Sequence, residues 1–151
     1  MRRWVVVLRA TILAGSMRDR TPIRSAAALT GVLFLAVGIL GFVPGVTTHY
    51  GDLGFAGHGS GAKLLGTFQV SVLQNLVHLL FGAVGLVLSR TADGAQTFLT
   101  GGGITYLALW VAGAIGAAGW LPANTPDNWL HFLLGIGMIG LGFVTGRGRS
   151  D

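Results

Sequence analysis

One pattern occurs twice in this chain: Asn75-Leu76-Val77-His78-Leu79-Leu80-Phe81-Gly82 and, 53 positions later, Asn128-Trp129-Leu130-His131-Phe132-Leu133-Leu134-Gly135. The Asn, His and Gly positions match, and the residues between them are apolar. On a helix, offsets of three and four residues bring matching positions onto one face. Both copies lie in uncharged runs long enough to span a membrane, where a polar, titratable face is costly. We therefore take Asn75, His78, Asn128 and His131 as the candidate polar intramembrane site.

Composition places the chain among membrane proteins. It has 151 residues, of which 52% are hydrophobic and 10% are charged, with a mean hydropathy of +0.69; soluble domains usually carry about 25% charged residues. Charged residues leave four long gaps, which predict four transmembrane helices near residues 25 to 43, 68 to 88, 98 to 120 and 127 to 145. The predicted fold class is an all-α integral membrane protein in which residues 25 to 146 form one four-helix transmembrane domain.

The distribution of cations predicts the orientation. Nine of the ten lie on one side of a four-span topology, and only Lys63 lies on the other. Since cytoplasmic loops carry the excess of Lys and Arg, we expect a multi-pass protein of the bacterial inner (plasma) membrane with both termini in the cytoplasm. These termini are a basic segment of residues 1 to 24 and a tail of residues 147 to 151. The same arginines would attract anionic lipid headgroups, so no nucleic-acid partner is needed to explain the charge.

Residues 1 to 16 have two interpretations. Met17 lies just before the cluster Arg18-Asp19-Arg20 and is an alternative start, which would leave residues 1 to 16 outside the protein. In the other interpretation, this segment is an interfacial amphipathic anchor. Neither gives it a chemical role.

Two missing residue types limit the chemistry. The chain has no Cys and no Glu, which excludes thiolate chemistry, iron–sulfur clusters and Cys zinc sites. No Asp lies in the interior of a predicted span, since Asp127 stands at the start of the fourth, so a paired-carboxylate acid/base site cannot be built there. His49, Asp52 and His58 lie close together in sequence, but their spacing does not pre-organise metal ligands. We therefore predict a protein without a metal site that is not an enzyme.

The match between the two halves extends to the preceding helices. In each half a pair of glycines precedes an outer proline. The first pair lies in Gly38-Ile39-Leu40-Gly41 and the second in Gly113-Ala114-Ile115-Gly116. The halves are thus predicted to be two tandem helical-hairpin repeats, related by a pseudo-twofold axis along the membrane normal, with the two histidines facing each other at one depth. Small residues allow close packing of membrane helices, and the predicted packing positions are Gly38, Gly41, Gly82, Gly85, Gly113, Gly116 and Gly135.

The outer loops differ between the halves. The second is a tight turn in which Thr125 is expected to cap the last helix, Pro126 to occupy its first position and Asp127 to complement its positive end. The first runs from Pro44 to about Thr67 and is rich in glycine. We expect it to be a mobile extracytoplasmic loop.

Several stretches resemble a known family. They are Gly41-Phe42-Val43-Pro44-Gly45, Leu64-Leu65-Gly66-Thr67-Phe68-Gln69-Val70, the first Asn-His-Gly stretch, and Asn124-Thr125-Pro126-Asp127-Asn128-Trp129-Leu130-His131. Over residues 25 to 145 the chain resembles small actinobacterial membrane proteins known as domain of unknown function 4383. The resemblance implies four transmembrane helices and no established activity. The family pattern often has a second histidine directly before the first Asn, where this chain has Gln74.

Three functions remain open for the paired His-Asn faces. In the first, Asn and His form hydrogen bonds between the second and fourth helices and fix their register in a non-enzymatic accessory or scaffold protein without a cofactor. In the second, His78 and His131 are the axial ligands of a b-type haem (haem b), since facing imidazoles suit that geometry. In the third, the imidazoles line a small-molecule or proton pathway. A pathway through four short helices favours a homo-oligomer or a larger membrane complex. We expect the first.

Overall fold

The computed structural model describes residues 22 to 117, residue 119 and residues 124 to 146. In this part of the chain, four α-helices and a small sheet follow one another: α2 (Pro22–Leu40), β1 (Thr47–Thr48), β2 (Lys63–Leu64), β3 (Phe68–Gln69), α3 (Val72–Leu88), α4 (Ala92–Ala114) and α5 (Thr125–Gly146). A 3-10 turn, η1 (Tyr50–Asp52), lies between β1 and β2. The predictions for residues 1 to 21, including the alternative start, and for residues 147 to 151 lie outside the described residues.

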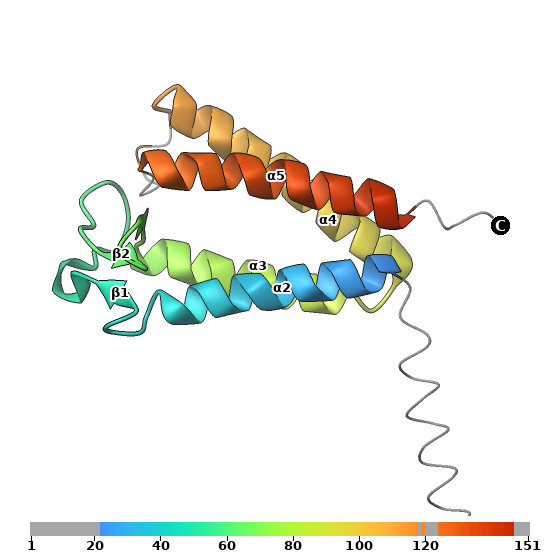
Figure 1. The fold of residues 1–151 in the computed structure, drawn as a ribbon, viewed down its shortest axis with the longest axis horizontal. Coiled ribbons are helices and arrows are strands. Elements are labelled where there is room, and N and C mark those ends of the chain that lie inside the picture. The colour runs from blue at the N-terminus through green and yellow to red at the C-terminus, as the bar shows by residue number, and fades with distance from the viewer. Residues whose placement is uncertain (1–21, 118, 120–123, 147–151) are drawn as a thin grey trace, which may run out of the picture.

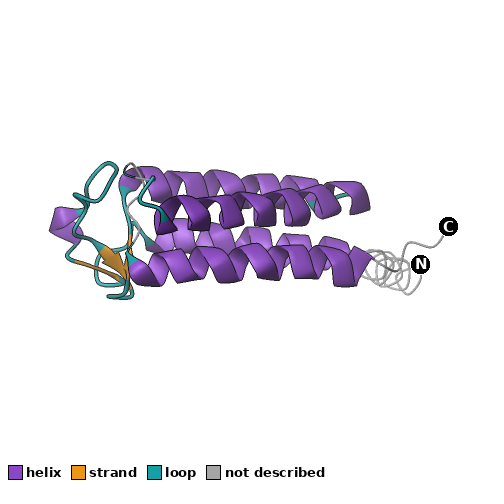
Figure 2. Ribbon diagram, turned by 90° about the horizontal axis from the view of Figure 1, so that it is seen from above, coloured by secondary structure: helices purple, strands orange, loops and turns teal. Residues whose placement is uncertain are grey.

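The helices pack as two pairs. α2 packs along α3 and α4 packs along α5, with less extensive contact between the pairs. Figures 1 and 2 show the helices running along the length of the molecule, with the sheet at one end. At the other end, Arg24 and Arg90 line one small cleft, where Arg24 Nε donates a hydrogen bond to Ser89 O at 3.2 Å. The two described arginines therefore lie at the end opposite Lys63 of β2.

Three of the described helices, α2, α4 and α5, are long and apolar enough to span a membrane. α3 has 17 residues, which gives about 25 Å at 1.5 Å per residue, the short end of membrane spans. Its predicted start at residue 68 is wrong, because Phe68 and Gln69 pair with β2. Ser71 caps the helix instead, since its side chain accepts a hydrogen bond from Gln74 N at 3.2 Å.

The third predicted helix, residues 98 to 120, is displaced toward the N-terminus and runs from Ala92 to Ala114. Thr91 caps it by accepting a hydrogen bond from Gly94 N at 3.0 Å. Asp93 lies in the first turn, where a carboxylate complements the helix dipole. A helix boundary placed only by gaps in charge misses this start, because it treats an acidic first turn as a loop. At the other end, Gly116 follows the helix with φ 70, the left-handed conformation typical of glycine after a helix.

The segment predicted to be a mobile loop instead forms a compact cap, which corrects both that prediction and the purely α-helical fold class. β1, β2 and β3 pair in an antiparallel sheet in which Leu64 of β2 lies between Thr47 and Phe68. Ala62, Leu64 and Val70 are buried and pack against partly buried side chains that include Val37 of α2. Ala62 and Leu64 are buried while Lys63 between them is exposed, which is the alternation of a strand with one buried face.

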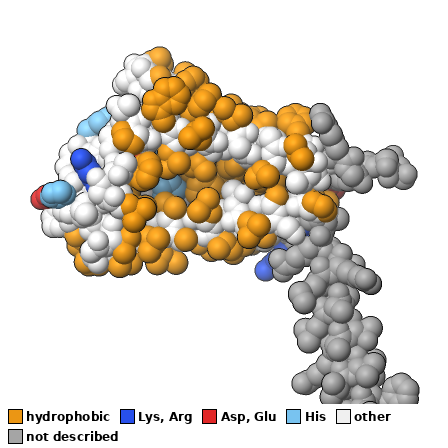
Figure 3. All heavy atoms as spheres, in the orientation of Figure 1, with side chains coloured by type: hydrophobic (Ala, Val, Ile, Leu, Met, Phe, Trp, Pro, Cys, Tyr) orange, Lys and Arg blue, Asp and Glu red, His pale blue; other side chains and the backbone are white. Residues whose placement is uncertain are grey.

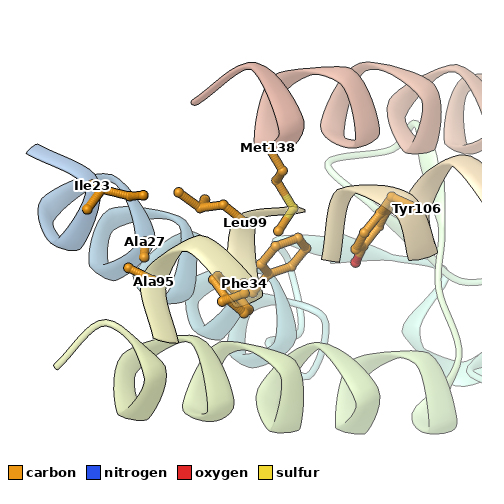
Figure 4. Packing of buried hydrophobic residues seen from close by; sticks show 8 residues of the cluster. Ile23, Ala27, Phe34, Ala95, Leu99, Tyr106 and Met138 are labelled. Atoms are coloured by element: carbon orange, nitrogen blue, oxygen red, sulfur yellow. The ribbon is translucent and has the colours of Figure 1, made fainter. Parts of the chain in front are cut away.

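The main hydrophobic core lies where α2, α4 and α5 meet. Its buried members are Ile23, Ala27, Phe34, Ala95, Phe98, Leu99, Tyr106 and Met138. Figure 4 shows these side chains in the space between the helices, with Ile23 and Tyr106 at the two ends of the cluster. Phe34 also lines the cavity described below, so the core and the candidate site are continuous.

Candidate functional site

A cavity of about 180 Å³ lies between the helix pairs, next to the sheet. Helices α2, α3 and α5 and strands β2 and β3 contribute its walls, and most of the lining side chains are leucine, valine and phenylalanine. The polar lining residues are Gln74, His78, Asp127 and His131. Figure 3 shows histidine surface in a hollow among hydrophobic side chains. The cavity is therefore apolar with a few polar groups, which is the usual character of a small-molecule site.

Both predicted histidines reach this cavity, from different helices. His78 belongs to α3 and is 9% exposed, and His131 belongs to α5 and is 4% exposed. Leu80 of α3 and Leu133 of α5, close to them in sequence, are more than half exposed on the outer surface. The two imidazoles thus lie on the inner faces of their helices.

Aromatic rings connect the two histidines. His78 stacks on Phe34 with ring centroids 5.9 Å apart, and Phe34 stacks on Tyr106 at 5.3 Å. Tyr106 in turn contacts His131 at 5.5 Å. Since Phe34 belongs to α2 and Tyr106 to α4, each histidine packs on a ring of its own helix pair, and the two rings meet between the pairs. The sequence predicted that the two histidines face each other, but it did not predict the two aromatic rings that contact them.

The predicted asparagines occupy a different place from the histidines. Asn75 is fully buried beside Gly41, just after α2, and Asn128 lies beside Gly113, near the end of α4. A methyl group on either glycine would collide with the amide of its asparagine. Each asparagine therefore packs within its own helix pair. The hydrogen bonds expected between the second and fourth helices do not form among the described residues.

Several polar atoms at the site are buried without a hydrogen-bond partner in the described part of the chain. They are Gln74 Oε1, His78 Nδ1, His131 Nδ1, Asn75 Oδ1 and Nδ2, and Asn128 Oδ1. A buried polar group without a partner costs about 1 to 3 kcal/mol, and such groups are rare enough in native proteins to require an explanation. Those of Gln74, His78 and His131 belong to residues that line the cavity.

Asp127 joins the cavity to the cap. Its carboxylate is buried, and Oδ2 accepts hydrogen bonds from Gln69 N of β3 at 2.9 Å and from Asn124 N at 3.0 Å. Asn124 Oδ1 accepts one from Asp127 N at 3.0 Å in return. Asn124 is thus the capping residue of α5, and Thr125, the predicted cap, is already helical. From the sequence, Asp127 was predicted only to complement the positive end of a helix, and its contact with the sheet was not predicted.

A signal for the missed residues was present in the repeated pattern. Gln74 directly precedes Asn75, and Asp127 directly precedes Asn128, so these two side chains occupy the same position of the motif. Phe34 and Tyr106 carry a weaker signal, because an aromatic residue in an apolar helix is usually a core residue.

The predicted packing glycines fall into two groups. Gly38, Gly82, Gly85 and Gly135 lie where an added methyl group would meet a neighbouring helix, as do Gly41 and Gly113 at the asparagines. The two atoms nearest to a methyl group added at Gly82 are backbone atoms of α2, at Gly31 and Leu35. Gly116, in contrast, has open space around it, and its role is to end α4.

Four helices, of which three are long and apolar enough to span a membrane, together with a cavity between the helix pairs, define this chain as a helical protein with membrane-span-like segments. The family described as Domain of unknown function (DUF4383) matches residues 24 to 144, and the chain belongs to this family. Comparison with curated proteins and with solved structures gave no match.

Proposed function

We propose that this chain is a non-enzymatic integral membrane protein of the bacterial inner membrane, a four-helix bundle of two tandem hairpins whose central cavity binds a small molecule. Embedding in a bilayer is supported by the exposed apolar surface. Leu29, Leu80 and Val144, on three different helices, are each at least 67% exposed. Figure 3 shows hydrophobic side chains along the helices and basic ones only toward the two ends.

Matching contacts in the two halves support the tandem repeat. Phe34 and Tyr106 are 72 positions apart, and so are Gly41 and Gly113, which make the same contact with an asparagine. In the second helices the offset is 53, the spacing of the two histidines. The capping residues Ser71 and Asn124 are also 53 positions apart.

This register differs from the one suggested by sequence. Gly41 corresponds to Gly113 through the contacts with asparagine, whereas the sequence pattern paired Gly41 with Gly116, one helical turn away. The reason is that two glycines three positions apart are too short a pattern to fix a register. Contact with a distinctive partner, here an asparagine, does fix the register.

The observation that carries the binding proposal is that three polar side chains in the apolar cavity wall, those of Gln74, His78 and His131, each have a buried atom without a hydrogen-bond partner among the described residues. If the histidines served only to fix helix register, their ring nitrogens would have partners on a neighbouring helix. Instead, His78 Nδ1 and His131 Nδ1 are buried without partners beside a cavity. A ligand in the cavity that contacted these side chains would account for keeping polar residues in an apolar wall.

The haem alternative has less geometric support. Phe34 stacks on His78 and Tyr106 contacts His131, so a macrocycle bound between the imidazoles would compete with both aromatic rings for these contacts. The cavity is close in size to an engineered cavity of about 150 Å³ that binds benzene, far below the size of a haem.

The orientation of the proposed bundle can be measured with reporter fusions. We expect a fusion at Arg90, which joins the two helix pairs, to report the cytoplasmic side, because positive charge is retained there and attracts anionic headgroups. A fusion at His58 in the cap should report the opposite side. If both fusions reported the same side, α2 and α3 could not both span the membrane.

Substitution of the histidines distinguishes a binding site from a structural one. His78→Leu and His131→Leu should leave the melting temperature of the ligand-free protein in detergent unchanged or raise it, because each removes a buried polar atom without a partner. Under the register interpretation, each would instead lower the free energy of unfolding by about 1 to 2 kcal/mol.

Asn75→Leu is the control for this experiment. Asn75 is fully buried and fits closely under Gly41, so a branched apolar side chain should destabilise the protein even though it also removes unpartnered atoms. A visible absorption spectrum of the same samples tests the haem alternative. A Soret band that disappears in either histidine variant would contradict the binding proposal in favour of haem.

A further inference from the structure

A cleft that two arginines line lies at the end of the molecule opposite the sheet. It measures about 170 Å³, lies between the start of α2 and the end of α3, and is lined by Arg24, Ala28, Leu86, Ser89 and Arg90. We infer that this cleft binds the phosphate group of one anionic phospholipid. The inference rests on one part of the proposed function, that the chain is embedded in a membrane, and adds a lipid site that does not involve the central cavity.

The charge of the cleft selects an anion. Arg24 and Arg90 lie far apart in sequence, and the packing of α2 along α3 brings both to the same cleft. No acidic side chain is among the described residues that line it, so an anion bound there would reduce the repulsion between the two like charges. A guanidinium presents its N–H groups as a planar fork that matches the oxygens of a phosphate. Phosphate is therefore the anion that suits the cleft best.

One of the two arginines is already held in place. Arg24 Nε donates a hydrogen bond to Ser89 O at 3.2 Å, which ties the first turn of α2 to the residue that caps the end of α3. Arg24 is half-buried, whereas Arg90 is exposed in the loop between α3 and α4. A side chain that is ordered before binding loses less conformational entropy when a ligand arrives. Arg24 thus gives the cleft a fixed positive charge, and Arg90 adds the second from the loop.

The apolar part of the cleft favours a lipid over a free phosphate ion. Ala28 and Leu86 also line it, and each lies about one helical turn farther from the helix ends than the two arginines. Next to them in sequence, Leu29 is 71% exposed and Val87 is 56% exposed. The cleft therefore leads from cations at the helix ends to an apolar surface that faces lipid in the proposed bundle. A phospholipid has the same order of groups, and anionic lipids are concentrated in the cytoplasmic leaflet, where the proposed orientation places Arg90.

Native mass spectrometry of the detergent-purified full chain, titrated with dioleoyl phosphatidylglycerol, tests this inference. The control lipid, dioleoyl phosphatidylcholine, has the same acyl chains and a phosphate but carries no net charge. We expect one phosphatidylglycerol to bind at least about tenfold more tightly than phosphatidylcholine, because only the anionic headgroup neutralises the arginines. Inorganic phosphate added in excess should not displace the lipid, because it cannot contact the apolar part of the cleft.

Two pairs of variants locate the bound lipid. Arg90→Gln should weaken binding of phosphatidylglycerol about tenfold, as expected for the loss of one charge-assisted hydrogen bond. Arg147→Gln removes the same charge directly after α5 in sequence and should change binding by less than about twofold. Ala28→Phe fills the cleft without a change of charge and should also weaken binding about tenfold. Ala83→Phe, at an exposed position of α3, is its control.

Several results would overturn the inference and leave membrane embedding intact. If phosphatidylcholine bound as tightly as phosphatidylglycerol, or if each variant behaved like its control, the cleft would not be a site for an anionic lipid. Displacement of the lipid by inorganic phosphate would make the cleft a site for the free ion instead. Membrane embedding itself would be overturned by a different result, a chain that stayed soluble and monomeric without detergent.

Discussion

Replacing Asp127 with alanine should destabilise the protein more than any other substitution of a polar residue at the site. The change removes the acceptor of two backbone hydrogen bonds, from Gln69 N and Asn124 N, and one half of the reciprocal cap of α5. Because a buried donor left without a partner costs about 1 to 3 kcal/mol, we expect the free energy of unfolding to fall by about 2 to 4 kcal/mol. Thermal unfolding in detergent would measure this as a lower melting temperature.

Asp127→Asn separates the hydrogen bonds from the charge. The amide oxygen can take the place of Oδ2 and accept from both backbone groups, so we expect a loss of no more than about 1 kcal/mol. Asp93→Asn is a positional control, because Asp93 also lies in the first turn of a helix but is exposed. It should cost less than Asp127→Ala. If Asp127→Ala and Asp93→Asn had equal effects, the contact between α5 and the sheet would contribute nothing to stability.

The helices were the most predictable part of the fold, for a physical reason. A long run without charged residues can cross a membrane only if its backbone groups form hydrogen bonds with one another, as they do in a helix. Four helices were therefore expected, and four are found among the described residues. Their ends were less predictable, because caps such as Thr91 and Ser71 depend on one side chain each. The sheet was not predicted at all, since strands of two residues leave almost no periodic signal.

The candidate site was predicted in part. His78 and His131 could be found because they are polar and repeated inside apolar runs, and both line the cavity. Their partners could not be found in the same way. Phe34 is an ordinary core residue by its sequence, and its position between the helix pairs depends on how those pairs pack. Gln74 appeared only as a departure from a family pattern, although it lies in the wall of the cavity.

The sequence also could not show which glycines matter most. All the predicted packing glycines look alike in a glycine-rich chain, and their importance depends on what lies opposite each one. An added methyl group at Gly137 of α5 would meet open space, whereas one at Gly82 of α3 would lie 2.6 Å from Gly31 O and 2.7 Å from Leu35 N. Only the packed structure separates the two.

Gly82→Ala should accordingly give the largest loss of stability among the helix-packing glycines. The methyl group meets backbone atoms of α2, which cannot rotate away as a side chain can, so α2 and α3 must separate along their length. We expect the free energy of unfolding to fall by about 2 to 3 kcal/mol, the upper part of the usual range for overpacking. Gly137→Ala, on an open face of α5, should change it by no more than about 0.5 kcal/mol.

Gly135→Ala completes the series, because Gly135 is the counterpart of Gly82 in the proposed repeat. The nearest atoms to its added methyl group belong to the Leu107 side chain, at 2.7 Å, and Gly103 O lies farther away, at 3.0 Å. Since a leucine side chain can adopt another rotamer, we expect a loss of about 1 kcal/mol. Melting temperatures in detergent should therefore fall in the order Gly137→Ala, Gly135→Ala, Gly82→Ala. An equal loss of stability in Gly82→Ala and Gly137→Ala would mean that α2 and α3 do not approach each other through their glycines. The packing described for the first hairpin would then be wrong.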